Sequence, residues 1–117
     1  MPWINVNYSR KLALHETDEI KSEFAEIMKA VFDKNESGLV VSFAEPYVLY
    51  RGGTATQEAV VLDVRYIGQF SLEKKRELMK RFTECLSRVL RVDPQEVTLL
   101  FSEMDSQNWG RGAGDFS

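Results

Sequence analysis

The second residue of the chain has a type and a position that could make it a base. The sequence opens Met1-Pro2, and loss of Met1 leaves Pro2 with a free secondary amine. An α-amine has a pKa of about 7.7–8.0, and an apolar pocket disfavours its charged form. Such an amine is neutral near pH 7 and can accept a proton as a general base. The alternative is structural, because a proline costs no ladder hydrogen bond at the first residue of a strand.

Interconversion of the enol and keto forms of a 2-oxo acid needs a base, a cation for the carboxylate and an apolar wall. Arg65 suits the second role because its guanidinium can grip a carboxylate in two places and stays protonated. Phe101 and Trp109 are candidates for the wall. The alternatives are a solvated strand-edge charge for Arg65, a core position for Phe101 and subunit packing for Trp109.

Composition excludes several classes of function. A net charge of −3 argues against nucleic-acid binding, and 44% hydrophobic with 28% charged residues is ordinary for a soluble globular protein without membrane spans. We expect no metal, because His15 is the only histidine and Cys85 the only cysteine. The Gly52-Gly53 pair lacks the spacing of a phosphate-binding loop, and we expect no cofactor. The N-terminus lacks the pattern of a signal peptide, and the lone cysteine fits a reducing cytoplasm.

The elements that must position these residues repeat at an offset of 58 positions. Residues 4–8 (Ile-Asn-Val-Asn-Tyr) correspond to residues 62–66 (Leu-Asp-Val-Arg-Tyr). The apolar stripe at 20, 24, 27, 28, 31 and 32 corresponds to 78, 82, 85, 86, 89 and 90, with the spacing of an amphipathic helix. Each helix precedes a β-prone run, at 39–43 and 97–101. We therefore expect one domain over residues 1–117 with repeats at 2–53 and 60–112.

The order strand, helix, strand predicts two parallel, right-handed β-α-β units. Together they make an α/β fold with a four-stranded sheet and both helices on one face. The other face is expected to carry large apolar residues, which predicts burial by oligomerisation. Thr17 or Asp18 is expected to cap the first helix and Ser71 the second, and Asp93-Pro94 to end the second. Residues 51–56 are expected to form a turn rather than an interdomain linker.

Taken in order, these features resemble the tautomerase superfamily. The resemblance covers nearly the whole chain: Pro2 with its strand, the duplication, Phe43-Ala44-Glu45-Pro46 before Gly52-Gly53, Tyr66-Ile67-Gly68, and Ser102-Glu103-Met104 before Trp109-Gly110-Arg111-Gly112. It implies an amino-terminal proline exposed by loss of Met1. Length and the glycine segments look most like the macrophage migration inhibitory factor branch, which implies a homotrimer with sites between subunits. The ending looks more like the malonate semialdehyde decarboxylase and cis-3-chloroacrylic acid dehalogenase branches.

The resemblance also implies roles for single residues. Pro2 matches the general base or acid, and Lys34 and Ile67 match positions that line the inhibitory-factor pocket. Thr98 and Leu100 stand where that branch has a tyrosine and an asparagine. Arg65 falls near the carboxylate-binding arginines of the decarboxylase and dehalogenase branches, and Glu36 near the acid that works with the proline in the decarboxylase. The dehalogenase's glutamate near the carboxy terminus has no counterpart.

Three functions follow as expectations. The first is a cytoplasmic, cofactor-independent tautomerase or isomerase acting on a small carboxylate, with Pro2 and Arg65 catalytic and with Lys34, Ile67, Phe101, Trp109 and Arg111 binding the substrate. Arg111 could instead pair with Asp115. The second is a decarboxylase that uses Pro2, Arg65 and Glu36. The third is a non-catalytic trimer that binds a protein partner, which gains weight if Met1 is retained.

Overall fold

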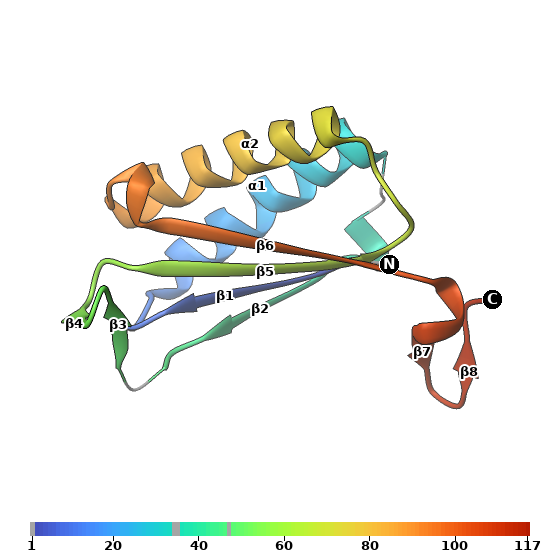
Figure 1. The fold of residues 1–117 in the computed structure, drawn as a ribbon, viewed down its shortest axis with the longest axis horizontal. Helices are drawn as coiled ribbons and strands as arrows, with labels where there is room; N and C mark the ends of the chain where they lie inside the picture. Colours follow the sequence, from blue (N-terminus) through green and yellow to red (C-terminus); the bar gives the residue numbers. More distant parts are fainter. Residues whose placement is uncertain (1, 34–35, 47) are drawn as a thin grey trace.

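A mixed four-stranded sheet forms the base of the molecule (Figure 1). The computed structural model describes residues 2–33, 36–46 and 48–117. The strand order is β2 (Val40–Ala44), β1 (Pro2–Tyr8), β5 (Val60–Ile67) and β6 (Val97–Met104). The outer pairs, β1 with β2 and β5 with β6, are parallel, and the central pair β1 with β5 is antiparallel. The expected pair of β-α-β units is therefore confirmed.

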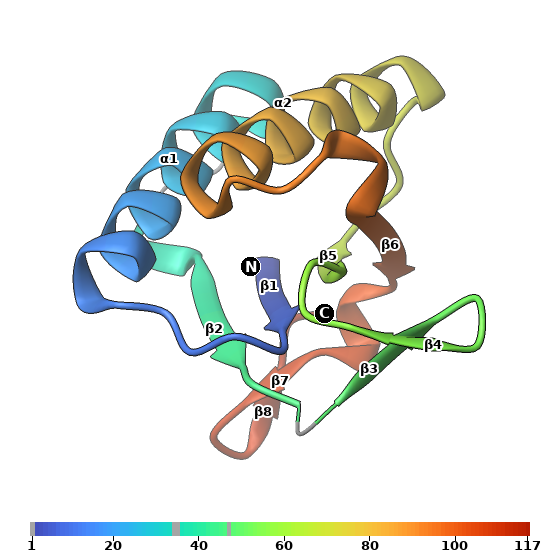
Figure 2. The same cartoon turned by 90° about the vertical axis from the view of Figure 1, so that its left-hand side faces the viewer.

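Both helices cover the same face of the sheet (Figures 1 and 2). Helix α1 spans Leu14–Phe32 and helix α2 spans Leu72–Leu90, so the two start 58 positions apart. Their apolar stripes pack on alternate strand residues, which lie on one face of a pleated sheet. The core contains Ile4, Val6, Ile20, Phe24, Leu62, Val64, Leu78, Phe82 and Leu86, all at most 1% exposed. Cys85 is buried among them, as its place in the stripe predicted.

The helix ends agree only in part with the sequence prediction. Ser71 caps α2 by accepting a hydrogen bond from the Lys74 amide at 3.2 Å, as expected. The prediction for α1 was wrong: the helix begins at Leu14 after Ala13, and Glu16 satisfies the Ala13 amide at 2.9 Å. Helix α2 does not reach Asp93-Pro94.

The last residue of α2 is Leu90, and the chain turns at Arg91, whose φ is 59°. Asp93 instead accepts a hydrogen bond from the Gln95 amide at 2.8 Å and so caps the short 3-10 helix η2 (Pro94–Glu96). A second short 3-10 helix, η1 (Glu36–Gly38), precedes β2. The Asp93-Pro94 signal was therefore real but belongs to the turn that follows the helix.

The face of the sheet away from the helices carries large apolar residues, as the sequence predicted, together with polar ones. We call it the open face; strand alternation places on it residues 3, 5 and 7 of β1, 40, 42 and 44 of β2, 61, 63, 65 and 67 of β5, and 98, 100, 102 and 104 of β6. Its large apolar residues share it with polar side chains; they are Trp3, Val40, Val61, Ile67, Leu100 and Met104. Among these, the Trp3 indole donates to Ser42 at 2.8 Å, and Ser42 donates to Asn5 at 2.9 Å.

Two small hairpins project on the open-face side, at opposite ends of the sheet (Figures 1 and 2). The first pairs β3 (Leu49–Arg51) with β4 (Thr54–Thr56), and its turn is Gly52-Gly53, both at positive φ. The expected turn in residues 51–56 is thus present, with strands on either side. The second hairpin follows the short helix η3 (Ser106–Asn108) and pairs β7 (Gly110–Arg111) with β8 (Gly114–Asp115). No described helix is long and apolar enough to cross a membrane.

Candidate functional site

Pro2 is buried at the first residue of β1, in the middle of the sheet. Its cross-strand partner is Tyr66, near the carboxyl end of β5. Paired residues point to the same side, so Pro2 and the fully buried Tyr66 both face the helix layer. An amine at this position lies beside aromatic rather than solvent-exposed surroundings, which is the setting that favours its neutral form.

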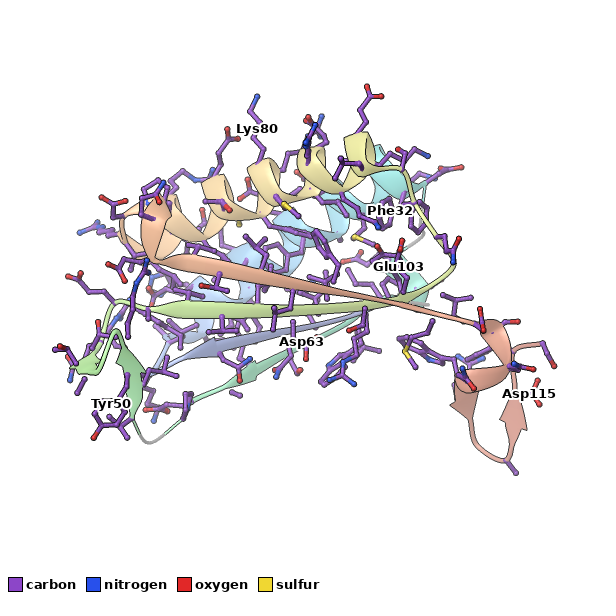
Figure 3. The ribbon with its side chains drawn as sticks, viewed as in Figure 1. Phe32, Tyr50, Asp63, Lys80, Glu103 and Asp115 are labelled. Atoms are coloured by element: carbon purple, nitrogen blue, oxygen red, sulfur yellow. The ribbon has the colours of Figure 1, made fainter. Side chains whose placement is uncertain are left out.

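Arg65 lies next to Pro2 on the opposite face of the sheet. It pairs across the strands with Trp3, and its guanidinium carbon lies 5.3 Å from the centre of the Trp3 ring. The guanidinium also donates to both carboxylate oxygens of Asp63, at 3.1 and 3.3 Å. These bonds raise the pKa of Arg65 above its ordinary value, so the group carries its charge throughout. Figure 3 shows Asp63 beneath the sheet, away from the helices.

A partly buried polar cluster, which we call the Glu103 cluster, lies beside Pro2 and consists of Tyr66, Lys75 and Glu103 with the backbone of Phe70. The Glu103 carboxylate accepts hydrogen bonds from the Lys75 ammonium at 2.8 Å, the Phe70 amide at 2.7 Å and the Tyr66 hydroxyl at 3.0 Å. These donors, Lys75 above all, hold the pKa of Glu103 below its usual range. Burial and the neighbouring carboxylate raise the pKa of Tyr66, which keeps its phenol protonated.

Aromatic rings close this cluster against the helices. Phe70 stacks on Phe32 with ring centroids 3.6 Å apart and meets Tyr66 edge-on at 5.0 Å. Figure 3 shows Phe32 and Glu103 at the same end of the molecule, where α1 ends and α2 begins. The site around Pro2 therefore has a dry aromatic side toward the helices and a charged side toward the open face.

The sequence analysis did not place Lys75 and Glu103 among the site residues. A signal was present: residues 97, 99 and 101 of β6 are apolar and face the helices, and Glu103 continues the same alternation. A carboxylate in a core-facing register needs buried donors. Those donors come from β5, from the loop after it and from α2. Sequence periodicity does not predict how these segments pack against β6.

The other predicted residues divide between the two faces and the second hairpin. Ile67 follows Tyr66 at the end of β5, half-buried on the open face, and so lies near Pro2. Phe101 lies on the helix side, packed against the core with its ring 6.4 Å from that of Tyr66. Glu36 is exposed in η1 and forms an ion pair with Lys21 at 3.6 Å. Lys34 lies outside the described residues.

Trp109 and Arg111 belong to the projecting second hairpin rather than to the body of the molecule (Figure 1). Trp109 is half-buried, and its carbonyl accepts from the Phe116 amide at 3.0 Å. Arg111 lies over the Phe116 ring at 5.7 Å, an alternative to the Asp115 partner considered from the sequence. Within one subunit these contacts tie both residues to the hairpin.

The described residues contain no group of three or more His, Cys, Asp or Glu side chains arranged to hold a metal ion. The chemistry that the site can perform with its own groups is acid-base chemistry at Pro2, with a cation beneath it at Arg65.

Comparison with known proteins shows what this chain is similar to. A family sequence model described as "Tautomerase enzyme" matches residues 61–115, which include β5, α2 and β6. The match covers a little under half of the chain, so this part of the sequence is similar to the tautomerase family. A search of curated protein sequences found no match. Similarity of fold to solved structures extends over nearly the whole chain.

Three solved structures illustrate the tautomerase fold of this chain. The migration inhibitory factor MIF2 of Leishmania major has a TM-score of 0.88 and 14% identity over 99% of this chain and 97% of that one. A fused 4-OT described as an asymmetric trimer has a TM-score of 0.88 and 15% identity, covering 97% and 94%. Pt0534 inactivated by 2-oxo-3-pentynoate has a TM-score of 0.86 and 11% identity, covering 96% and 93%.

Proposed function

We propose that this protein is a cofactor-independent tautomerase that interconverts the enol and keto forms of a small 2-oxo acid. Pro2 is the general base, after removal of Met1. The observation that carries the proposal is the placement of Pro2: buried at the start of β1, paired with Tyr66, and one residue from the Trp3–Arg65 contact. The 2-oxo acid class is supported by Pt0534, which is similar in fold and is inactivated by 2-oxo-3-pentynoate.

The proposed reaction moves one proton and needs no other reactant. In the enol-to-keto direction, the neutral amine of Pro2 takes the proton of the enol hydroxyl. The resulting enolate then accepts a proton on carbon from the prolinium ion, so the amine is regenerated. Arg65 holds the substrate carboxylate and offsets the negative charge that grows on the adjoining oxygen. Positioning together with proton transfer supplies the rate acceleration.

We propose that the working unit is a homotrimer. Trp109 and Arg111 belong to the second hairpin, which projects from the sheet at the end where β1 begins, and we propose that they complete a Pro2 site together with a neighbouring subunit (Figure 1). Lys34 and Ile67 keep their proposed roles as pocket residues, and Phe101 supports the site from the core side.

A decarboxylase that uses Pro2, Arg65 and Glu36 is the second candidate. Glu36 lies in η1, just before β2. Because Val40 at the start of β2 pairs with Trp3, Glu36 lies near the end of the sheet where β1 starts at Pro2. Its exposed carboxylate has only a long ion pair to Lys21 among the described contacts. Loss of carbon dioxide release in Glu36→Gln, with enol–keto turnover unchanged, would favour this second function.

The deciding experiment is the intact mass of the protein from its native host, followed by a phenylpyruvate enol–keto assay. We expect a mass without Met1 and turnover that falls at least about 10²-fold in Pro2→Ala. A retained methionine blocks the amine and favours the non-catalytic binding function. Turnover that Pro2→Ala leaves unchanged would remove Pro2 from the mechanism.

A further inference from the structure

The two β-α-β units differ at the ends of their sheets where the Glu103 cluster and its counterpart lie. Positions 58 apart correspond, so Tyr66, Phe70, Lys75, Phe101 and Glu103 have the counterparts Tyr8, Leu12, Thr17, Phe43 and Glu45. In the second unit, Phe70 fills space by stacking on Phe32, and Lys75 reaches across to Glu103. The first unit has a smaller residue at both positions, Leu12 and Thr17.

A hollow of about 170 Å³ lies where the first unit lacks those two large side chains. Its lining includes Leu12 and Thr17 with the buried Tyr8 and the half-buried Phe43. It lies at the end of the sheet where β1 and β2 finish, opposite the end where β1 starts at Pro2. The Thr17 hydroxyl is already used, since it donates to the Leu14 carbonyl at 3.0 Å. The floor of the hollow is therefore apolar and aromatic.

The rim of the hollow carries positive charge that the second unit lacks. Arg10 and Lys11 line it, whereas the corresponding positions are Gly68 and Gln69. The guanidinium carbon of Arg10 lies 5.4 Å from the centre of the Tyr8 ring, and its Nη2 forms an ion pair with Glu16 Oε2 at 3.3 Å. Lys11 is exposed and has no carboxylate partner among the described contacts. Arg10 is compensated by Glu16 and Glu45 is the one acidic lining residue, so Lys11 is the rim cation without a carboxylate partner in the described contacts.

We propose that this hollow, the Tyr8 pocket, is a second ligand site that binds a small monocarboxylate with an apolar body. The body packs on Tyr8, Phe43 and Leu12, and the carboxylate lies at the rim beside Lys11 and Arg10. Ligand pockets combine an apolar lining with a few polar groups in this way. The volume is below the range of about 300–1,000 Å³ typical of drug-sized ligands, which restricts the occupant to the size of a single ring or a short branched chain.

The test is a nuclear magnetic resonance titration of the full-length protein with benzoate, using benzamide as the neutral isostere and benzylamine as the cation. We expect saturable shifts at Tyr8, Leu12 and Phe43 with benzoate. We also expect binding at least about tenfold weaker with benzamide and benzylamine. Equal binding of the three probes, or no saturable shift at these residues, would overturn the proposal.

Two variants replace residues of the first β-α-β unit with their counterparts from the second unit. Leu12→Phe with Thr17→Lys restores the residues that fill the other end, and Lys11→Gln copies Gln69 at the rim with little effect on folding. Both are expected to weaken benzoate binding at least about tenfold. Lys80→Gln removes a lysine on the outer side of α2 and is expected to leave binding unchanged (Figure 3). Undiminished binding in Lys11→Gln would overturn the rim assignment.

Pro2→Ala separates this inference from the proposed function. The Tyr8 pocket lies at the other end of β1, so benzoate shifts there are expected to persist in Pro2→Ala even as turnover falls. Loss of those shifts in Pro2→Ala would mean that benzoate binds at the Pro2 site, which overturns the second site and leaves the tautomerase proposal standing.

Discussion

At the scale of single residues, Arg65 is the group whose contacts bear most directly on substrate binding. Its guanidinium is held between the Trp3 ring and Asp63 on the open face, so its orientation is fixed before a substrate arrives. Fixed, bidentate donors are the geometry that a carboxylate requires. The Asp63 carboxylate is at the same time a competitor for the substrate at that guanidinium.

We expect Arg65→Ala to lower kcat/KM for a 2-oxo acid at least about tenfold, because one charge-assisted pair contributes roughly 1.5–3 kcal/mol. Steady-state kinetics with phenylpyruvate measures the loss. Arg81→Ala is the matched control, since Arg81 is also paired with a glutamate but lies on α2. Equal kinetics in Arg65→Ala and Arg81→Ala would return Arg65 to the role of a strand-edge charge.

Glu103 is the residue whose charge state most affects stability at the Pro2 end. Its pKa is lowered in the folded protein, so its ionised form stabilises the fold above the unfolded pKa of about 4.3. That contribution is lost as pH falls through the lower folded pKa. The free energy of unfolding of the wild type should therefore decline as pH falls below about 4.3.

We expect Glu103→Gln to be less stable than the wild type near pH 7 and to approach it as the pH is lowered. Urea unfolding at several pH values measures the difference. Glu77→Gln is the control, because Glu77 pairs with Arg81 on the exposed side of α2 and such pairs contribute little. A constant gap between wild type and Glu103→Gln at all pH values would contradict this account.

At this scale the sequence was informative about chemistry and less informative about partners. Pro2 could be singled out because its reactivity depends on its own backbone nitrogen. Arg65 could be proposed as a cation, but its contact with Trp3 depends on the antiparallel register of β1 and β5. Lys75 and Glu103 meet from α2 and β6, and that meeting is a property of packed elements.

At the scale of elements, helix starts illustrate the difference between composition and geometry. Ser71, Thr17 and Asp18 are all residue types that favour the N-cap position. Only at Ser71 does the helix begin at the next residue, so its hydroxyl meets the Lys74 amide. The first helix starts earlier, at Leu14, because the Glu16 side chain reaches back to the Ala13 amide and substitutes for a capping hydroxyl.

We therefore expect Ser71→Ala to lower the free energy of unfolding by about 1 kcal/mol and Asp18→Ala to change it by much less. Thermal and urea unfolding of the two variants measures this directly. Both residues are exposed, so the comparison isolates the capping bond from core packing. A larger loss in Asp18→Ala than in Ser71→Ala would mean that the α1 boundary is misplaced.

The strands were more predictable than the helix ends. Apolar alternation in β1 and β5 and the 58-residue offset predicted the two parallel pairs of the sheet, whereas the antiparallel pairing of β1 with β5 was not predicted. The strands of the first hairpin, β3 and β4, were not expected, because three-residue strands carry too little periodicity to separate them from a turn.

At the scale of the whole molecule, the open face of the sheet is the surface through which we expect subunits to associate. The helices cover one side of the sheet, while the other side leaves Leu100 on β6 52% exposed and carries a network of polar side chains on β1 and β2. A mixed face of this kind resembles a protein–protein interface more closely than a second core. The prediction of an oligomer rests on the large apolar residues of this face, and its polar groups with directional hydrogen bonds would fix how subunits meet.

We expect the protein to be a trimer of about 40 kDa in solution, three times the 13.5 kDa chain. Leu100→Glu places a charge in the centre of β6 on the open face and should shift the mass toward 13.5 kDa, because an unpaired charge is costly inside an interface. Light scattering coupled to size exclusion measures both masses.

Leu14→Glu is the matched control for this shift in mass. Leu14 is 76% exposed at the start of α1, on the helix side of the molecule, and its substitution should leave the trimer intact. If Leu100→Glu and wild type have the same mass, the open face is not the interface. If instead Leu100→Glu is a folded monomer, loss of its turnover would show that the Pro2 site depends on a neighbouring subunit.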